Sequence, residues 1–224
     1  MNKLVLAIVI IYSVSNIFGS CHKNKDENVQ VTFEIPLAIT PAKDTINVGD
    51  TLTLEATFPD TIREVTSGRF FRLENFDFRT SIGFIKIGDT SKYISEAPGN
   101  TSTHKIIVKT GTVAGLSGSF GNIKFAYGDN HYRLNIQFVT GQKGVSTISF
   151  FSKHFGTTTL LNNIDLGPSV AGGRKIAYLR NVWYVINDGQ TYFELYRKNA
   201  KVGNLNSPDE NSSETKGTYT FVVR

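Results

Sequence analysis

The stretch "TINVGDTLTLEATF", Thr45 to Phe58, carries the clearest signal of secondary structure in the chain. Its second half alternates apolar and polar residues, and the apolar set is Leu52, Leu54, Ala56 and Phe58. A repeat of two residues is the period of a β-strand that has one face in a core and the other in solvent. Gly49-Asp50 supplies a turn immediately before this strand. The stretch therefore predicts a half-buried strand that is entered through a tight turn.

Similar short segments continue on both sides of this strand. They are Val29 to Ile35, the aromatic-rich run Arg69 to Ile87, Lys105 to Thr110, Asn122 to Tyr127, His131 to Thr140, Val145 to Phe151 and Thr218 to Val223. Gly128-Asp129-Asn130 predicts a hairpin between two of them, and Gly141 to Gly144 predicts a second hairpin. Repeated short strands joined by such turns are typical of an all-β sandwich.

"VGDTLTL", Val48 to Leu54, resembles the opening strands of bacterial immunoglobulin-like domains. The resemblance implies an immunoglobulin-like antiparallel sandwich, and it concerns the fold rather than the function. We expect one sandwich unit over residues 30–224. A partial repeat, Lys143 to Ile148 against Lys216 to Phe221, favours the alternative of two stacked sub-domains that divide within 156–173.

The most distinctive interior stretch is Tyr178 to Arg197, which contains the only tryptophan of the chain. Asn187-Asp188-Gly189 predicts a hairpin within it, whereas Gln190 to Asn199 is also compatible with one short helix. Exposed aromatic rings can stack on sugars, and the candidate glycan-binding residues are Trp183, Tyr184 and Tyr192. The alternative is that these rings belong to the core and to cross-strand pairs, as most aromatic residues of β proteins do.

The N-terminus predicts export. Lys3 supplies a positive charge, and Leu4 to Tyr12 is an apolar run that is too short to span a bilayer as a helix. Small residues, Gly19-Ser20, follow this run. We therefore expect residues 1–20 to be a signal peptide.

Cys21 is the only cysteine of the chain, which is unusual for an exported protein because exported cysteines are generally paired. Phe18-Gly19-Ser20-Cys21 resembles the lipobox of bacterial lipoproteins. The resemblance implies that Cys21 is lipidated and that the membrane is a partner through this anchor. The charged and polar residues that follow Cys21 predict a polar tether over 21–29. Lys25-Asp26-Glu27 also resembles the export tag of Bacteroidetes-type surface lipoproteins. The expected location is the outer membrane, with the protein facing either the cell surface or the periplasm.

Composition argues against several other classes of function. The net charge of +5 is modest and dispersed, so no nucleic-acid partner is expected. The four histidines are scattered without metal-ligand spacing, and no cysteine ligands accompany them. Gly167 to Arg174 lacks the Gly-Lys-Ser/Thr ending of a phosphate loop. The sequence therefore predicts no catalytic residues, no metal and no cofactor.

Three Asp-Thr pairs lie within a short part of the chain, and each is followed by an aliphatic residue. They resemble the O-glycosylation sequon of secreted Bacteroidetes-type proteins, which makes Thr45, Thr51 and Thr61 candidate modification sites. The alternative is that Asp favours a turn and Thr favours the strand that follows.

Together these features predict a non-enzymatic, lipid-anchored protein of the cell envelope. It would act as a structural or interaction module, with an envelope protein or a glycan as partner. The alternative is a glycan-binding accessory lipoprotein of a carbohydrate uptake system.

Overall fold

The structure is a computed structural model of the 224-residue chain, and it describes residues 25–87, 104–117, 120–150, 159–161, 172–199 and 213–224. The predicted signal peptide, Cys21 and most of the 156–173 segment lie outside these ranges, and the predicted tether is described only from Lys25. The chain divides into two compact units. Unit 1 contains 1–29 and 160–178, and unit 2 contains 30–159 and 179–224.

Within the described residues, seven strands form one sheet in the order β10-β11-β3-β1-β14-β13, with β7 also paired to β11. The strands are β1 (Lys25–Thr40), β3 (Thr51–Pro59), β7 (His104–Thr110), β10 (Ala126–Gly128), β11 (His131–Thr140), β13 (Thr159–Leu160) and β14 (Gly172–Ile186). β3 pairs antiparallel with β1 and with β11. Leu52, Leu54, Ala56 and Phe58 are all buried, as the alternation of the opening stretch predicts.

A second sheet contains six described strands in the order β2-β15-β12-β6-β9-β8. They are β2 (Thr45–Ile46), β6 (Arg79–Ile87), β8 (Thr112–Ser117), β9 (Phe120–Lys124), β12 (Gly144–Phe150) and β15 (Thr218–Val223). After Thr40 the chain leaves the first sheet, and β2 then joins the second sheet parallel to β15. The other pairings with a described register are antiparallel.

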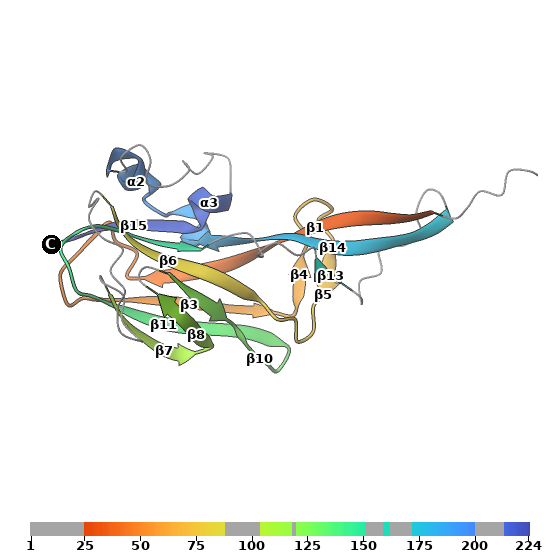
Figure 1. Cartoon of the computed structure of the whole chain (residues 1–224), viewed down its shortest axis with the longest axis horizontal. Coiled ribbons are helices and arrows are strands. Elements are labelled where there is room, and N and C mark those ends of the chain that lie inside the picture. Colours follow the sequence, from red (N-terminus) through yellow and green to blue (C-terminus); the bar gives the residue numbers. More distant parts are fainter. Residues whose placement is uncertain (1–24, 88–103, 118–119, 151–158, 162–171, 200–212) are drawn as a thin grey trace, which may run out of the picture. The chain divides into compact units, whose positions relative to one another are not determined.

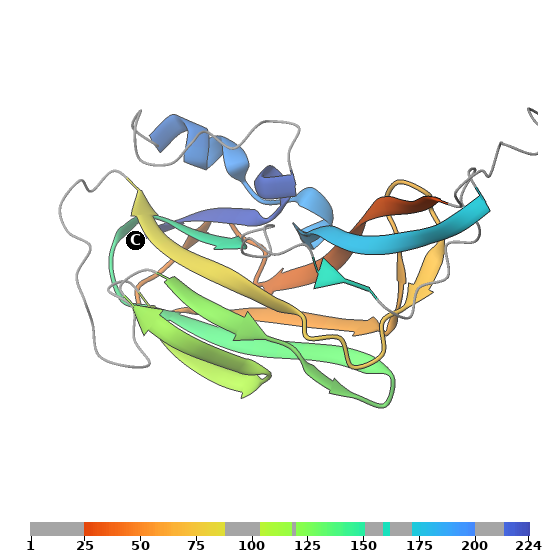
Figure 2. The same cartoon turned by 45° about the vertical axis from the view of Figure 1, so that its right-hand side comes forward.

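In unit 2 the two sheets form the layers of a sandwich. Figure 2 shows the layer with β6 and β15 lying over the layer with β3 and β11. Aromatic side chains from both layers meet between them. The ring centres of Phe84 in β6 and Phe138 in β11 are 5.1 Å apart across the two layers, whereas Phe58 of β3 stacks on Tyr132 of β11 within one layer. The predicted all-β sandwich is confirmed as the fold class.

Two local predictions are wrong because strands change sheets. The predicted strand Asn122 to Tyr127 is broken at Phe125, where β9 of one sheet gives way to β10 of the other. β12 does not pair back onto β11, because it lies in the second sheet between β15 and β6. The hairpin at Gly128-Asp129-Asn130 is confirmed: Asp129 and Asn130 both have positive φ, as a two-residue turn of type I′ requires.

The stretch after β14 contains helix rather than a hairpin. Asn187 to Gly189 forms a 3-10 turn, η1, and α2 (Phe193–Asn199) follows it. Oδ1 of Asn187 accepts a hydrogen bond from the Ile39 amide at 2.8 Å, and Nδ2 donates one to the Ile39 carbonyl at 3.2 Å. These two bonds fix the turn against β1. α2 and α3 (Ser213–Lys216) lie beside β15 (Figure 1). The short-helix alternative is thus confirmed, and the hairpin at Asn187-Asp188-Gly189 is wrong.

Unit 1 contains the first residues of β1, Leu160 of β13 and the first half of β14. The backbone amide of Arg174 donates to the Asp26 carboxylate at 2.9 Å. Leu161 and Ala177 are buried here, and the Leu161 amide donates to the Ala177 carbonyl at 2.9 Å. Among the helices that the structure describes, none has the length and apolar character needed to cross a membrane.

Candidate interaction surface

A two-stranded hairpin in unit 2 carries the most exposed large apolar side chain of the described residues. β4 (Thr61–Arg63) pairs antiparallel with β5 (Phe70–Arg72), with Arg63 opposite Phe70 and Thr61 opposite Arg72. These four side chains are exposed and form what we call the outer hairpin face. Phe70 is 67% exposed, although phenylalanine is among the residue types most often buried.

The opposite face of the hairpin is buried. Ile62 and Phe71 are both in the core. The Phe71 ring packs edge-on against the ring of Phe33 in β1, with 6.4 Å between the ring centres. Because neighbouring strand residues point to opposite faces, burial of Phe71 turns Phe70 outward. The guanidinium of Arg69 lies 5.4 Å from the centre of the Phe71 ring, a cation–π distance.

A buried carboxylate holds the turn of this hairpin. Oε1 of Glu64 accepts hydrogen bonds from the backbone amides of Thr32 at 3.2 Å and Thr66 at 3.0 Å, and Oε2 accepts from the amide of Ser67. Burial acts to raise the pKa of Glu64, but these donors outweigh it and lower the pKa to about 2. Glu64 therefore remains ionised, and its charge is directed at backbone amides rather than at solvent.

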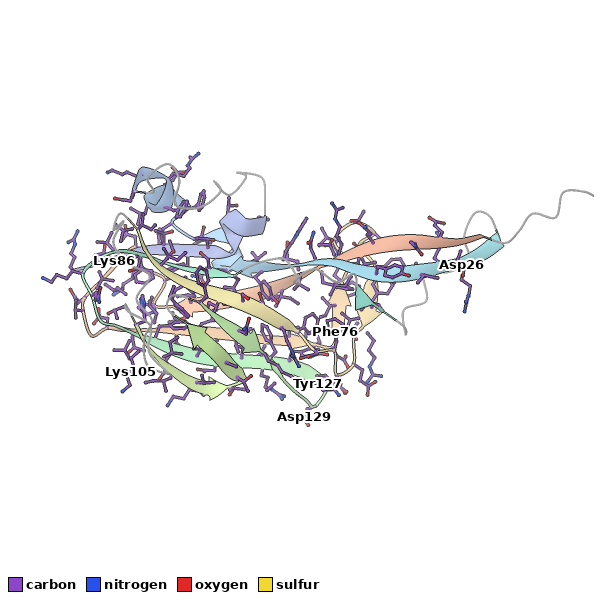
Figure 3. The ribbon with its side chains drawn as sticks, viewed as in Figure 1. Asp26, Phe76, Lys86, Lys105, Tyr127 and Asp129 are labelled. Atoms are coloured by element: carbon purple, nitrogen blue, oxygen red, sulfur yellow. The ribbon has the colours of Figure 1, made fainter. Side chains whose placement is uncertain are left out.

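A second carboxylate holds the base of the hairpin. Asp60, buried just before β4, accepts hydrogen bonds from Arg72 Nε at 3.1 Å and from the Tyr127 hydroxyl at 3.0 Å. Burial acts to raise the pKa of Asp60, but the hydrogen bonds from Arg72 and Tyr127 bring it below its usual value. Figure 3 shows Tyr127 and Asp129 together at the β10–β11 end of unit 2. The Asp60 amide also donates to the Asn130 carbonyl at 2.8 Å.

The segment after β5 is held by Tyr132 of β11. Its hydroxyl donates to the Leu73 carbonyl and accepts from the Phe76 amide. Burial raises the pKa of Tyr132 well above its ordinary value. The hairpin is therefore fixed at its turn, at its base and just beyond its second strand, so the outer hairpin face is presented by a rigid support.

The charges near this face are unevenly compensated. Arg72 lies 3.1 Å from Asp60 and 3.4 Å from Glu74. Arg63, in contrast, has no carboxylate within 4 Å among the described residues. Its guanidinium lies beside Gly68, where φ is +69° and a Cβ atom would be 3.3 Å from Nη2. The outer hairpin face thus combines an exposed aromatic ring with an uncompensated guanidinium, and aromatic residues and arginine are enriched at protein interfaces.

The predicted glycan-binding residues do not form one patch. Tyr184 is only 2% exposed and stacks in the core on Phe125, so its ring is not available to a sugar. Trp183 is half-buried and, as the preceding strand residue, points to the other face of β14. Tyr192 has a φ of +53°, and its hydroxyl donates to the Ala42 carbonyl at 3.0 Å. The structure places these three rings in different surroundings. Tyr184 belongs to the core, which is the alternative given above to a sugar-binding role.

The three candidate O-glycosylation residues lie at separate places in unit 2. Thr51 and Thr61 are exposed, at the first residues of β3 and β4. Thr45 is half-buried in β2 opposite Val222. Thr61 belongs to the outer hairpin face, and its hydroxyl donates to Asp60 Oδ1 at 3.3 Å.

Within the described residues, no group of three His, Cys, Asp or Glu side chains could hold a metal ion. His104 is buried between the sheets, with its ring 6.0 Å from Phe84 and 5.9 Å from Phe221. Burial lowers the pKa of His104 to about 4. His131 lies at the β10–β11 hairpin, where Nδ1 is 2.8 Å from the Asp129 carbonyl.

The sequence patterns single out neither Arg63 nor Phe70. Phe70 falls within the predicted strand run "RFFR" (Arg69 to Arg72), and Arg63 lies outside every predicted strand. The available signal was the adjacent pair Phe70-Phe71. In a strand two neighbouring phenylalanines cannot both face the same core, so one of them must be displayed unless both faces of the strand are covered.

Comparison with solved structures finds two cohesin structures from Acetivibrio cellulolyticus. The type II cohesin dyad from the adaptor ScaA scaffoldin is 13% identical with a TM-score of 0.30, and the match covers 57% of this chain and 40% of that one. A type II cohesin domain from the cellulosome is 14% identical with a TM-score of 0.30, and the match covers 66% of this chain and 95% of that one. The chain thus spans about two fifths of the length of the dyad. No protein-family model matches the chain, and no characterised protein matches its sequence.

These cohesin similarities are too low to indicate what the chain binds. Its own residues define an all-β sandwich protein with a rigidly held hairpin that displays Phe70 and Arg63.

Proposed function

We propose that this protein is a non-catalytic interaction module of the bacterial cell envelope, attached to the outer membrane through lipid on Cys21. The lipobox-like sequence before Cys21 supports the anchor. The observation that carries the interaction role is the outer hairpin face, where Phe70 is 67% exposed beside Arg63. An exposed aromatic ring on a rigid support contributes apolar contact at a low cost in conformational entropy.

The hairpin is suited to binding rather than to chemistry. Its two buried carboxylates, Asp60 and Glu64, are occupied by structural hydrogen bonds, and the pKa of each is lowered. A general acid at neutral pH needs a raised carboxyl pKa, and a general base is most effective with a pKa close to the working pH. Neither carboxylate meets this requirement, so the hairpin is proposed to bind a partner and not to catalyse a reaction.

Site-specific photo-crosslinking in the native host tests this function. A photoreactive residue in place of Phe70 should give one reproducible adduct with an envelope component. The matched control carries the same residue in place of Thr57, which is exposed on the outer face of β3. Adducts that are identical at both positions, or absent from position 70, would contradict the proposed function.

A further inference from the structure

The charges of the outer hairpin face indicate what its partner must supply. Arg72 is compensated by Asp60 and Glu74, and Glu64 is buried with its carboxylate turned to backbone amides. Of the three side chains that surround Phe70 on this face, Thr61 is neutral and the other two are arginines. Among the described residues no acid belongs to the face itself, and Arg63 lacks an ionic partner.

We infer that the partner is a protein segment that places a carboxylate on Arg63 next to an apolar contact for Phe70. This inference rests on the proposed function and specifies the partner of the same surface. A carboxylate matches the planar guanidinium because two oxygens can accept two parallel N–H bonds. Arg63 and Phe70 are directly opposite each other in the hairpin, so one short segment can reach both.

The chemistry of the face favours a protein over an anionic glycan. Sugar hydroxyls both donate and accept hydrogen bonds, so a site that binds them needs acceptors, such as amide and carboxylate oxygens, as well as donors. The outer hairpin face offers guanidinium donors, which cannot accept, and one hydroxyl, that of Thr61, which already donates to Asp60. A phenylalanine ring with arginine beside it is instead suited to an apolar protein surface bordered by acidic residues.

The test is a selection from a random-peptide display library on the purified full chain in detergent, with counter-selection on the Phe70→Ser variant. Peptides that bind the chain and not the variant should carry Asp or Glu. Their affinity, measured by fluorescence anisotropy, should fall about tenfold or more on Arg63→Glu. Replacing the peptide carboxylate by Lys should restore binding to Arg63→Glu.

The matched control is Lys105→Glu, which changes the net charge equally. Figure 3 shows Lys105 at the end of unit 2 away from Tyr127 and Asp129. This control should bind the peptides as the unmodified chain does, and thermal unfolding should show that each variant is folded. If the selected peptides need Phe70 but bind Arg63→Glu equally well, the inference is wrong and the proposed function stands.

Two other outcomes also reject the inference. Polygalacturonate, an anionic glycan, could bind in an Arg63-dependent manner when no peptide does, and the partner would then be a glycan. If neither probe distinguishes the chain from Phe70→Ser, the outer hairpin face is not a binding surface, and the proposed function fails together with the inference.

Discussion

The backbone amide of Thr32 donates a hydrogen bond of 3.2 Å to Oε1 of Glu64, which joins β1 to the turn between β4 and β5. The same carboxylate accepts hydrogen bonds from the backbone amides of Thr66 and Ser67 within the turn. One buried side chain therefore fixes both the shape of the turn and its attachment to the sandwich.

Replacing Glu64 by Gln should destabilise unit 2 by about 1–3 kcal/mol, because an NH₂ group would replace one acceptor oxygen and face backbone N–H donors. Urea denaturation measures the change. Glu34→Gln is the matched control, since Glu34 is exposed on β1, and it should leave the midpoint unchanged. An equal effect of both substitutions would show that the buried carboxylate has no special role.

Tyr127→Phe should lower the free energy of unfolding of unit 2, because it removes one hydrogen bond to the Asp60 carboxylate. Asp129→Asn is the control at the same end of unit 2: it changes only an exposed ion pair with Arg133, which contributes little. The free energy of unfolding from urea curves separates the two variants. If Tyr127→Phe leaves stability unchanged, the Tyr127 hydroxyl adds nothing to the hydrogen bonds that Asp60 accepts from Arg72 and Thr61.

The pH dependence of stability should contain a component from His104. Its pKa is about 4 in the folded state against 6.5 for an ordinary histidine, so the unfolded state binds more protons between these values. Stability should therefore fall as the pH drops from about 6.5 to about 4, by about 3 kcal/mol in total. The Glu64 contribution is lost at lower pH, as the pH falls from 4.5 towards about 2. Urea curves at several pH values give the free energy of unfolding as a function of pH. Above pH 4.5 this free energy should change less steeply with pH in His104→Phe than in the unmodified chain. An unchanged pH dependence would reject the assignment to His104.

Cys21→Ser should abolish labelling of the protein by a fatty-acid probe and leave the precursor uncleaved by the lipoprotein signal peptidase, because serine provides no thiol for the thioether bond. Gel mobility and probe fluorescence measure both effects. Continued lipid labelling of this variant would end the lipoprotein hypothesis.

At least one of Thr45, Thr51 and Thr61 should carry a glycan in the native host. Thr51 and Thr61 are exposed, whereas Thr45 is half-buried, so the first two are the expected sites. Intact-mass spectrometry of host-purified protein, compared with the triple Thr→Ala variant, provides the measurement. A mass that equals peptide plus lipid alone would reject the sequon.

Several local features follow from the sequence itself. The alternation over Leu52 to Phe58 determines which side chains of β3 are buried, and Thr218 to Val223 forms β15 with the bounds that its pattern predicts. The two-residue turn at Asp129-Asn130 also follows from residue type, because both residues tolerate positive φ. These features are local, since side-chain period and turn conformation depend on a few adjacent residues.

Strand pairing and the choice of exposed side chains depend on contacts between distant parts of the chain, so the local sequence does not specify them. The pattern of β12 is compatible with pairing to β11, yet β12 lies between β15 and β6, because pairing partners depend on contacts between residues far apart in the chain. The burial of Glu64 likewise depends on the amide of Thr32, which is 32 residues away. "FF" at Phe70-Phe71 requires only that the two rings point in opposite directions; packing of Phe71 against Phe33 selects Phe70 as the exposed ring.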